Sequence, residues 1–189
     1  MNETTDPTTG PARSSLEWKE PQAAEPRYEL WAGEDLLATL SFGSPCRTLG
    51  TVETQEGRWT FQQAGFLRPS ILVREEESDL DLAVFRPGLL GHGRLRFTNG
   101  VVFQWRHEGL GSATWSFRGD GGEVLVALKL RPDGEEGPGP HRVQAEVEVT
   151  PVGHFSPRVP LLAALGWYLI LLHRQEEEPV TDGPIESVY

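Results

Sequence analysis

The sequence predicts a mainly β protein: a closed antiparallel barrel of about 10–12 strands around a buried hydrophobic C-terminal helix. Three observations support this. Short segments with alternating apolar and polar residues recur along most of the chain. Glycines and prolines, 21 and 15 among 189 residues, separate these segments as turn formers do. Residues 159–172 then run without a charge or an amide, close to the C-terminus.

The apolar run at 159–172 has the features of a helix. Pro157 and Pro160 stand at its start, where a missing N–H costs little, and Ser156 is the candidate N-cap. His173 follows the last leucine, where a basic group suits the C-terminal end of the helix dipole. Apolar side chains occupy every face, so the helix is expected to be buried on all sides or to sit in lipid.

The length of this run favours burial in a protein core. At roughly 1.5 Å per residue it spans about 21 Å, short of the roughly 30 Å hydrocarbon core of a bilayer. Arg158 and the glutamates at 176–178 close both ends with charge. The alternatives are a short membrane anchor and a partner-facing helix.

The segments before this helix are predicted to be strands. Asn99 and Gly100 lie between two of them and predict a hairpin with a type I′ turn. A closed barrel would surround the helix with apolar groups and would leave no free edge. The predicted strands are residues 28–31, 37–42, 49–54, 58–62, 66–74, 80–86, 94–98, 101–106, 113–118, 124–130 and 142–149.

The chain length suits one domain with a substantial core. We assign residues 27–174 to the barrel with its helix. Residues 1–26, rich in Thr, Ser, Glu and Pro, are predicted to be a disordered tail, and residues 175–189 an acidic tail. Leu16 and Trp18 are the large apolar residues of the first tail. They are expected to dock locally, with a short linear motif as the alternative.

The net charge of −11 is unevenly distributed. Residues 58–131 carry ten basic and eight acidic groups, whereas the segments on either side are strongly acidic. Nucleic acid is therefore not expected as a main ligand, and bulk charge disfavours an anionic membrane. The middle segment could still form a local basic face, for which the candidate surface-binding residues are Arg58, Arg94, Arg96, Arg106 and Arg118.

The alternative without a binding role is that these arginines occupy solvated strand positions and pair with nearby carboxylates. It applies equally to Arg68, Arg74 and Arg86, the other arginines of this stretch of strands.

No catalytic residue, metal site or cofactor site is predicted. The histidines show neither zinc-ligand spacing nor an i, i+4 pair on a helix. Cys46, the single cysteine, excludes an intrachain disulfide and lacks the context of a reactive nucleophile. The acidic residues around Asp79 and Asp81 lack the ligand spacing of a calcium loop. The five histidines are His92, His107, His141, His154 and His173.

The tryptophans are expected to fill the space between the barrel wall and the helix, with a ligand-binding or partner-binding rim as the alternative. They are Trp18, Trp31, Trp59, Trp105, Trp115 and Trp167.

Several features together resemble the tubby C-terminal-domain superfamily, which includes tubby-like proteins, LURP-one-related proteins and phospholipid scramblases. They are the strand series, the Gly-Arg-Trp-Thr-Phe segment at 57–61, the Asn99-Gly100 hairpin leading to Trp105, the Trp115 strand followed by Asp120-Gly121, and the helix at 161–172. The resemblance implies a barrel of about twelve strands around a central hydrophobic helix, and association with lipid or a membrane surface.

The chain departs from that superfamily in its acidity, its two lysines and its lack of a cysteine cluster before the domain. No phosphoinositide-binding or Ca²⁺-binding residues are therefore carried over.

The expected function is a non-enzymatic binding or scaffold module of tubby-like type, acting on lipid at a membrane surface or on a protein partner. One alternative is a small-molecule carrier or enzyme with a pocket at a barrel end, although a helix inside the barrel argues against a large cavity. The other is a protein anchored by its C-terminal helix. The polar N-terminus lacks the features of a secretory signal, so a cytoplasmic location is expected.

Overall fold

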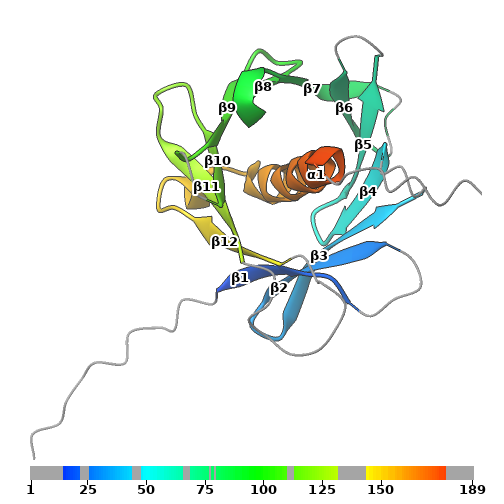
Figure 1. Cartoon of the computed structure of the whole chain (residues 1–189), viewed down its shortest axis with the longest axis vertical. Coiled ribbons are helices and arrows are strands. Elements are labelled where there is room, and N and C mark those ends of the chain that lie inside the picture. The colour runs from blue at the N-terminus through cyan, green and yellow to red at the C-terminus, as the bar shows by residue number, and fades with distance from the viewer. Residues whose placement is uncertain are drawn as a thin grey trace, which may run out of the picture.

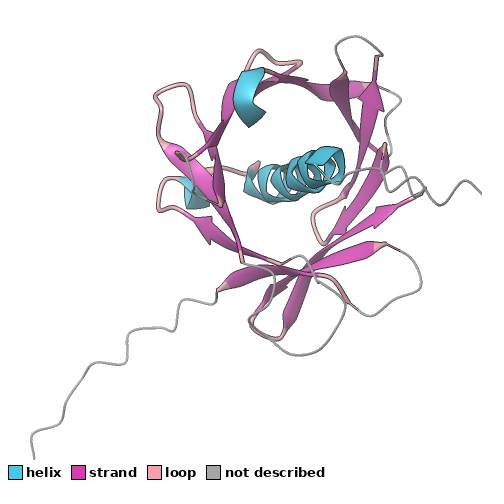
Figure 2. Cartoon of the chain, in the orientation of Figure 1, coloured by secondary structure: helices cyan, strands magenta, loops and turns pink. Residues whose placement is uncertain are grey.

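A computed structural model of the chain describes residues 15–21, 26–43, 48–65, 69–76, 78, 80–109, 113–131 and 144–177. Twelve antiparallel strands close into one barrel around a long helix, which confirms the predicted fold class (Figures 1 and 2). Each strand pairs with its neighbours in sequence, and β1 closes the ring by pairing with β12.

The strands are β1 (Leu16–Lys19), β2 (Arg27–Ala32), β3 (Asp35–Phe42), β4 (Leu49–Thr54), β5 (Arg58–Ala64), β6 (Ser70–Glu75), β7 (Asp81–Pro87), β8 (Gly93–Phe97), β9 (Val102–His107), β10 (Thr114–Arg118), β11 (Val124–Leu130) and β12 (Ala145–Val149). The helices are η1 (Leu89–Gly91), η2 (Gly153–Phe155) and α1 (Val159–Glu177).

Alternation along each strand separates the core from the outer surface, because successive side chains of a strand point to opposite faces. In β8 the buried residues are Gly93, Leu95 and Phe97, and the exposed residues between them are Arg94 and Arg96. This alternation sends the charges of the middle segment outward and the aromatic side chains inward.

The Asn99-Gly100 hairpin forms as predicted between β8 and β9, but the predicted type I′ turn is wrong. Gly100 donates from its N–H to the Phe97 carbonyl, and the N–H of Phe97 donates to the Val101 carbonyl. With Gly100 at a φ of +88°, this is the pattern of a three-residue loop whose last residue is left-handed.

The barrel begins earlier than predicted. Strand β1 lies inside the segment that was assigned to a tail, and it pairs with both β2 and β12. Trp18 is fully buried and stacks on Trp167 of the helix, with 5.9 Å between ring centroids. Local docking of Trp18 is thus confirmed, whereas a barrel boundary at residue 27 is wrong. A strand of four residues carries too little alternation to be seen in sequence. Residues 1–14 and 178–189 lie outside the described residues.

The helix begins at Val159, as predicted, but its end and its N-cap differ from the prediction. It continues to Glu177, beyond the predicted end. At its start, the Arg158 carbonyl accepts the first helical hydrogen bond, from the N–H of Leu162 at 2.9 Å, which makes Arg158 the N-cap. Ser156 instead supports the preceding turn, where its hydroxyl accepts from the N–H of Arg158. No helix in the described part of the chain is long and apolar enough to cross a membrane.

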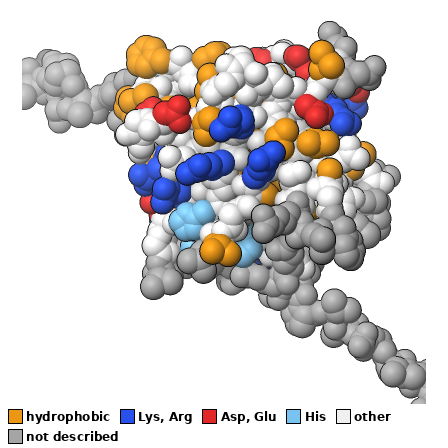
Figure 3. Space-filling view, turned by 90° about the horizontal axis from the view of Figure 1, so that it is seen from above, with side chains coloured by type: hydrophobic (Ala, Val, Ile, Leu, Met, Phe, Trp, Pro, Cys, Tyr) orange, Lys and Arg blue, Asp and Glu red, His pale blue; other side chains and the backbone are white. Residues whose placement is uncertain are grey.

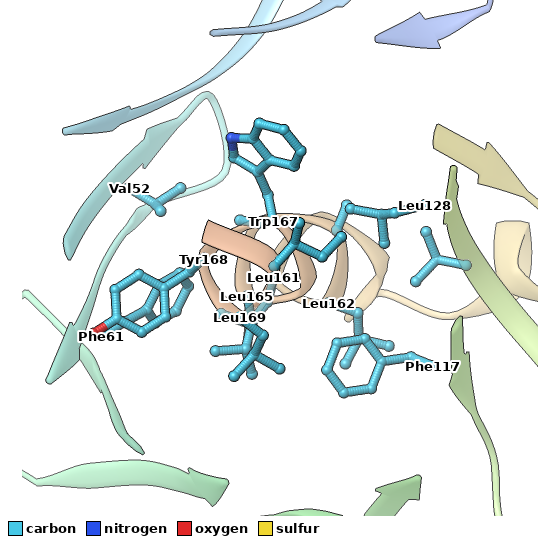
Figure 4. Close-up of a cluster of buried hydrophobic side chains, with 14 of the residues drawn as sticks. Val52, Phe61, Phe117, Leu128, Leu161, Leu162, Leu165, Trp167, Tyr168 and Leu169 are labelled. Atoms are coloured by element: carbon cyan, nitrogen blue, oxygen red, sulfur yellow. The ribbon is translucent and has the colours of Figure 1, made fainter. Parts of the chain in front are cut away.

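Every residue from 161 to 171 of α1 is buried inside the barrel (Figure 4). The backbone of the helix lies nearest to β3, β4, β5, β10 and β11. Gly166 permits this approach, because a Cβ there would lie 2.9 Å from Leu128 Cδ1 and 3.1 Å from the Trp105 ring. Five of the six tryptophans are buried, which confirms their predicted role in filling the core, and the sixth, Trp31, is half-buried.

Replacing Trp18 with alanine tests whether β1 belongs to the cooperative fold. We expect Trp18→Ala to lower the free energy of unfolding by about 3–5 kcal/mol, because the indole is buried against Trp167. The measurement is urea unfolding followed by circular dichroism. Trp31→Ala, which removes a half-buried indole, is the control and should cost much less. Equal losses in the two variants would place β1 outside the folded barrel.

A charge in the centre of α1 tests whether the helix is the core. Leu165 is fully buried, so Leu165→Asp would bury an unpaired carboxylate and is expected to prevent folding. Leu165→Met keeps the volume and should cost less than about 1.5 kcal/mol. A soluble Leu165→Asp protein that melts cooperatively would show that the helix is peripheral.

Candidate functional site

Four exposed arginines gather on the outer surface of three consecutive strands, and we call this group the arginine face. Arg86 belongs to β7, Arg94 and Arg96 to β8, and Arg106 to β9. The strand register places Arg86 directly opposite Arg94, and Arg94 directly opposite Gln104. Figure 3 shows basic side chains clustered together, with histidines beside them.

Among the described residues, the arginine face has little compensating negative charge: the Glu108 carboxylate interacts electrostatically with Arg106, but it is bound by Arg118. Arg106 donates from Nε and Nη2 to Gln104 Oε1, at 3.2 and 2.8 Å. Within the described residues, none of the four arginines forms an ion pair. Like charges directly opposite each other, as in Arg86 and Arg94, destabilise a sheet by roughly 0.2–1 kcal/mol. An anionic ligand would remove that repulsion.

Most of the other described cations on the barrel are paired. Six of them lie 2.5–3.0 Å from a carboxylate oxygen of Glu or Asp. This is the pairing with nearby carboxylates that the sequence left open as the alternative for the arginines. These six are Lys19, Arg27, Arg58, Arg74, Arg118 and Arg131.

The structure brings together three of the five arginines predicted for surface binding: Arg94, Arg96 and Arg106. Arg58 lies on β5, three strands from β8, and pairs with both Glu53 and Glu76.

Arg118 lies on β10, beside β9, but its charge is balanced by Glu108. The Nη2 of Arg118 donates to both carboxylate oxygens of Glu108, at 2.7 and 2.8 Å. Arg86 was missing from the predicted set, because only the strand register shows that it faces Arg94. Arg68 lies outside the described residues.

The Glu108 carboxylate is held in its charged form. Partial burial raises the pKa of this carboxyl, but the Ser116 hydroxyl and Arg118 donate hydrogen bonds to it. Together with the positive charges of Arg118 and Arg106, these bonds leave the pKa of Glu108 below its ordinary value. The ion pair therefore keeps Arg118 neutralised at physiological pH.

A pocket of about 820 Å³ opens at the barrel end near the C-terminal half of α1. Its apolar lining includes Ile71, Phe85 and Leu169, which are almost completely buried. The helix therefore leaves an open pocket at this end of the barrel.

Three histidines and two tryptophans complete the lining of this pocket. His107 lies against Trp115, with 4.6 Å between ring centroids, and Trp115 lies 6.3 Å from His173 in an edge-on arrangement. His92 comes from the connection between β7 and β8, and Trp105 lines the wall from β9. Trp105 and Trp115, predicted as core, thus also line a pocket, and a role of these tryptophans in ligand binding stays a prediction.

The described histidines do not form a metal site. Among the described residues, no three or more His, Cys, Asp or Glu side chains are grouped closely enough to hold a metal ion. His154 lies in η2, before the start of α1, whereas the pocket lies near its C-terminal half. Cys46 and His141 fall outside the described residues.

A shallow groove of about 1000 Å³ runs over the arginine face and meets the barrel-end pocket. Pro87, Gly88, His92 and Trp105 line both depressions. The arginine face and the pocket therefore adjoin across the connection from β7 to β8.

Comparisons with known proteins place the chain in no family. No family model matches it, and neither a curated protein nor a solved structure does. The resemblance to tubby-like domains therefore stays a prediction.

Neutralising Glu108 tests the electrostatic role of its ion pair. We expect Glu108→Gln to lower the free energy of unfolding at neutral pH by about 1 kcal/mol, the upper range for an exposed pair. Because the folded pKa is lowered, the contribution of Glu108 is complete above the unfolded value of about 4.3 and disappears as pH falls through the folded pKa.

Urea unfolding of wild type and variant across this pH range gives the measurement. The free energies of unfolding of wild type and Glu108→Gln should become equal at acidic pH. Glu146→Gln removes an exposed carboxylate on β12 and is the control. A gap between wild type and Glu108→Gln that stays constant with pH would contradict the assignment.

Proposed function

We propose that the chain is a non-enzymatic binding module of tubby-like type whose arginine face binds anionic lipid headgroups at a membrane surface. The observation that carries the proposal is the placement of Arg86, Arg94, Arg96 and Arg106 on adjacent strands without carboxylate partners among the described residues. The groove over these residues offers space for a headgroup.

Arginine suits this task for geometric and electrostatic reasons. Its planar guanidinium presents several N–H donors in a fork that matches the oxygens of phosphate or carboxylate. It stays protonated at all physiological pH values, so the face suits binding rather than proton transfer. This chemistry supports a binding function over an acid–base enzyme.

The negative net charge of the chain does not rule out such binding. At physiological ionic strength the Debye length is about 8 Å, so exposed charges farther away are largely screened. Each Arg close to an anionic leaflet contributes about 1 kcal/mol to binding. The cytoplasmic leaflet carries the anionic lipids, which is consistent with the proposed cytoplasmic location.

Vesicle co-sedimentation tests the proposal. Wild-type protein should bind phosphatidylcholine vesicles that contain phosphatidylserine or a phosphoinositide, and it should bind vesicles of phosphatidylcholine alone much more weakly. Arg94→Ala should lower the partition coefficient about fivefold, because about 1 kcal/mol is lost. Raising the salt concentration should weaken binding of both proteins.

Arg58→Ala is the matched control. It removes an exposed strand arginine whose charge is already paired with Glu53 and Glu76, so vesicle binding should change little. Equal binding to neutral and anionic vesicles, or equal effects of the two substitutions, would refute the lipid proposal. If an acidic protein bound to the wild type instead of vesicles, and Arg94→Ala lost this binding, the arginine face would be a protein-binding surface.

A further inference from the structure

We infer that the arginine face and the barrel-end pocket form one site for a single-chain amphipath with an anionic head, such as an alkyl phosphate. The head lies on the arginines and the alkyl chain enters the pocket. The inference rests on the proposed function for the head, and it adds the chemical class of the ligand.

The pocket has the properties of an alkyl-chain site. Ile71, Phe85 and Leu169 supply an apolar surface within the barrel, and Leu172 continues it along the helix. Its volume of about 820 Å³ lies within the roughly 300–1,000 Å³ of small-molecule pockets. Burying apolar chain against this surface is favourable in proportion to the area removed from water.

The pocket lies on a side of the barrel wall that the backbone of α1 does not approach closely. The backbone of α1 lies nearest to β3–β5 and β10–β11, and it makes fewer close approaches to β6–β9. On that side the Phe85 ring lies against the backbone of β8, because Gly93 has no side chain. A Cβ at Gly93 would lie only 2.2 Å from Phe85 Cζ.

The pocket and the arginine face adjoin at the connection from β7 to β8. The connection from β7 to β8 separates them, and Gly88 and His92 of this connection line both depressions. Gly88 has no side chain to block a ligand that crosses there. Arg86 and Arg94, two residues before Gly88 and two after His92, stand opposite each other where the head would lie.

A series of alkyl phosphates tests the inference on the wild-type protein. Isothermal titration calorimetry would compare glycerol phosphate with butyl, hexyl and octyl phosphate, each below its micelle concentration. We expect affinity to rise about fourfold for each methylene that the pocket buries. Glycerol phosphate should bind most weakly, and neutral octyl glucoside should bind less tightly than octyl phosphate.

The possible failures of the two proposals can be told apart. Affinities that do not depend on chain length overturn the inference, whereas the proposed function stands if anionic vesicles still bind. Octyl glucoside that binds as tightly as octyl phosphate overturns the coupling of pocket and arginine face. Absence of binding to every phosphate and to anionic vesicles overturns both proposals.

Two substitutions locate the two parts of the ligand. Leu172→Trp should fill the pocket and flatten the dependence on chain length, while vesicle binding by the arginine face persists. Leu16→Trp enlarges another part-buried leucine, on β1 away from the pocket, and should keep the dependence. Arg94→Ala should weaken every phosphate by a similar factor. If folded Leu172→Trp protein keeps the wild-type dependence of affinity on alkyl-chain length, the alkyl chain does not lie in the pocket. If this variant does not fold, the alkyl phosphate series on the wild-type protein decides the inference.

Discussion

The helix α1 and the barrel wall stabilise each other, because each buries the apolar surface of the other. A barrel of eight strands is filled by its own side chains, and barrels of about sixteen strands enclose a channel, so twelve strands leave room that needs further filling. A helix that is apolar on every face supplies it, at about 1.5–3 kcal/mol for each large side chain buried. The fit is close enough that a Cβ at Gly50 would lie 3.0 Å from the Tyr168 ring. Tyr168 also donates to the Thr48 carbonyl, and its burial raises the pKa of its phenol.

Mutual burial of the helix and the wall leaves two indole nitrogens in the core without hydrogen bonds to the described residues, and it confines the charged side chains to the outer surface. The indole nitrogens of Trp18 and Trp167 are buried without a hydrogen-bond partner among the described residues, at about 1–3 kcal/mol each. Stacking of the two rings and the burial of their large surface offset this cost. Because the inner positions of each strand are taken by apolar groups, the charges occupy the outer positions. Many of them pair there, and on the arginine face four cations collect with no ion pair to a carboxylate among the described residues.

The proposed ligand site lies where the apolar interior of the barrel adjoins the charged outer surface. The backbone of the helix makes few close approaches to β6–β9, beside which the pocket lies, and β7–β9 carry the arginine face on their outer side. An anionic amphipath would use both, with charge outside and chain inside. The helix then has two roles, since it fills most of the barrel and its Leu169 and Leu172 line what remains.

The fold class, and the division of each strand into inward-facing and outward-facing residues, could be predicted from the amino-acid sequence. Alternation along the strands, the Asn99-Gly100 hairpin and the apolar run at 159–172 are local patterns, and local geometry is enough to interpret them. Four features could not be predicted in this way: closure of the barrel through β1, the pairing of Arg86 opposite Arg94, the ion pair of Arg118 with Glu108 and the pocket at the barrel end. These features depend on register and on contacts between residues far apart in the chain, as with Trp18 against Trp167. Such contacts are selected by the packing of the whole barrel, and no short segment of sequence encodes them.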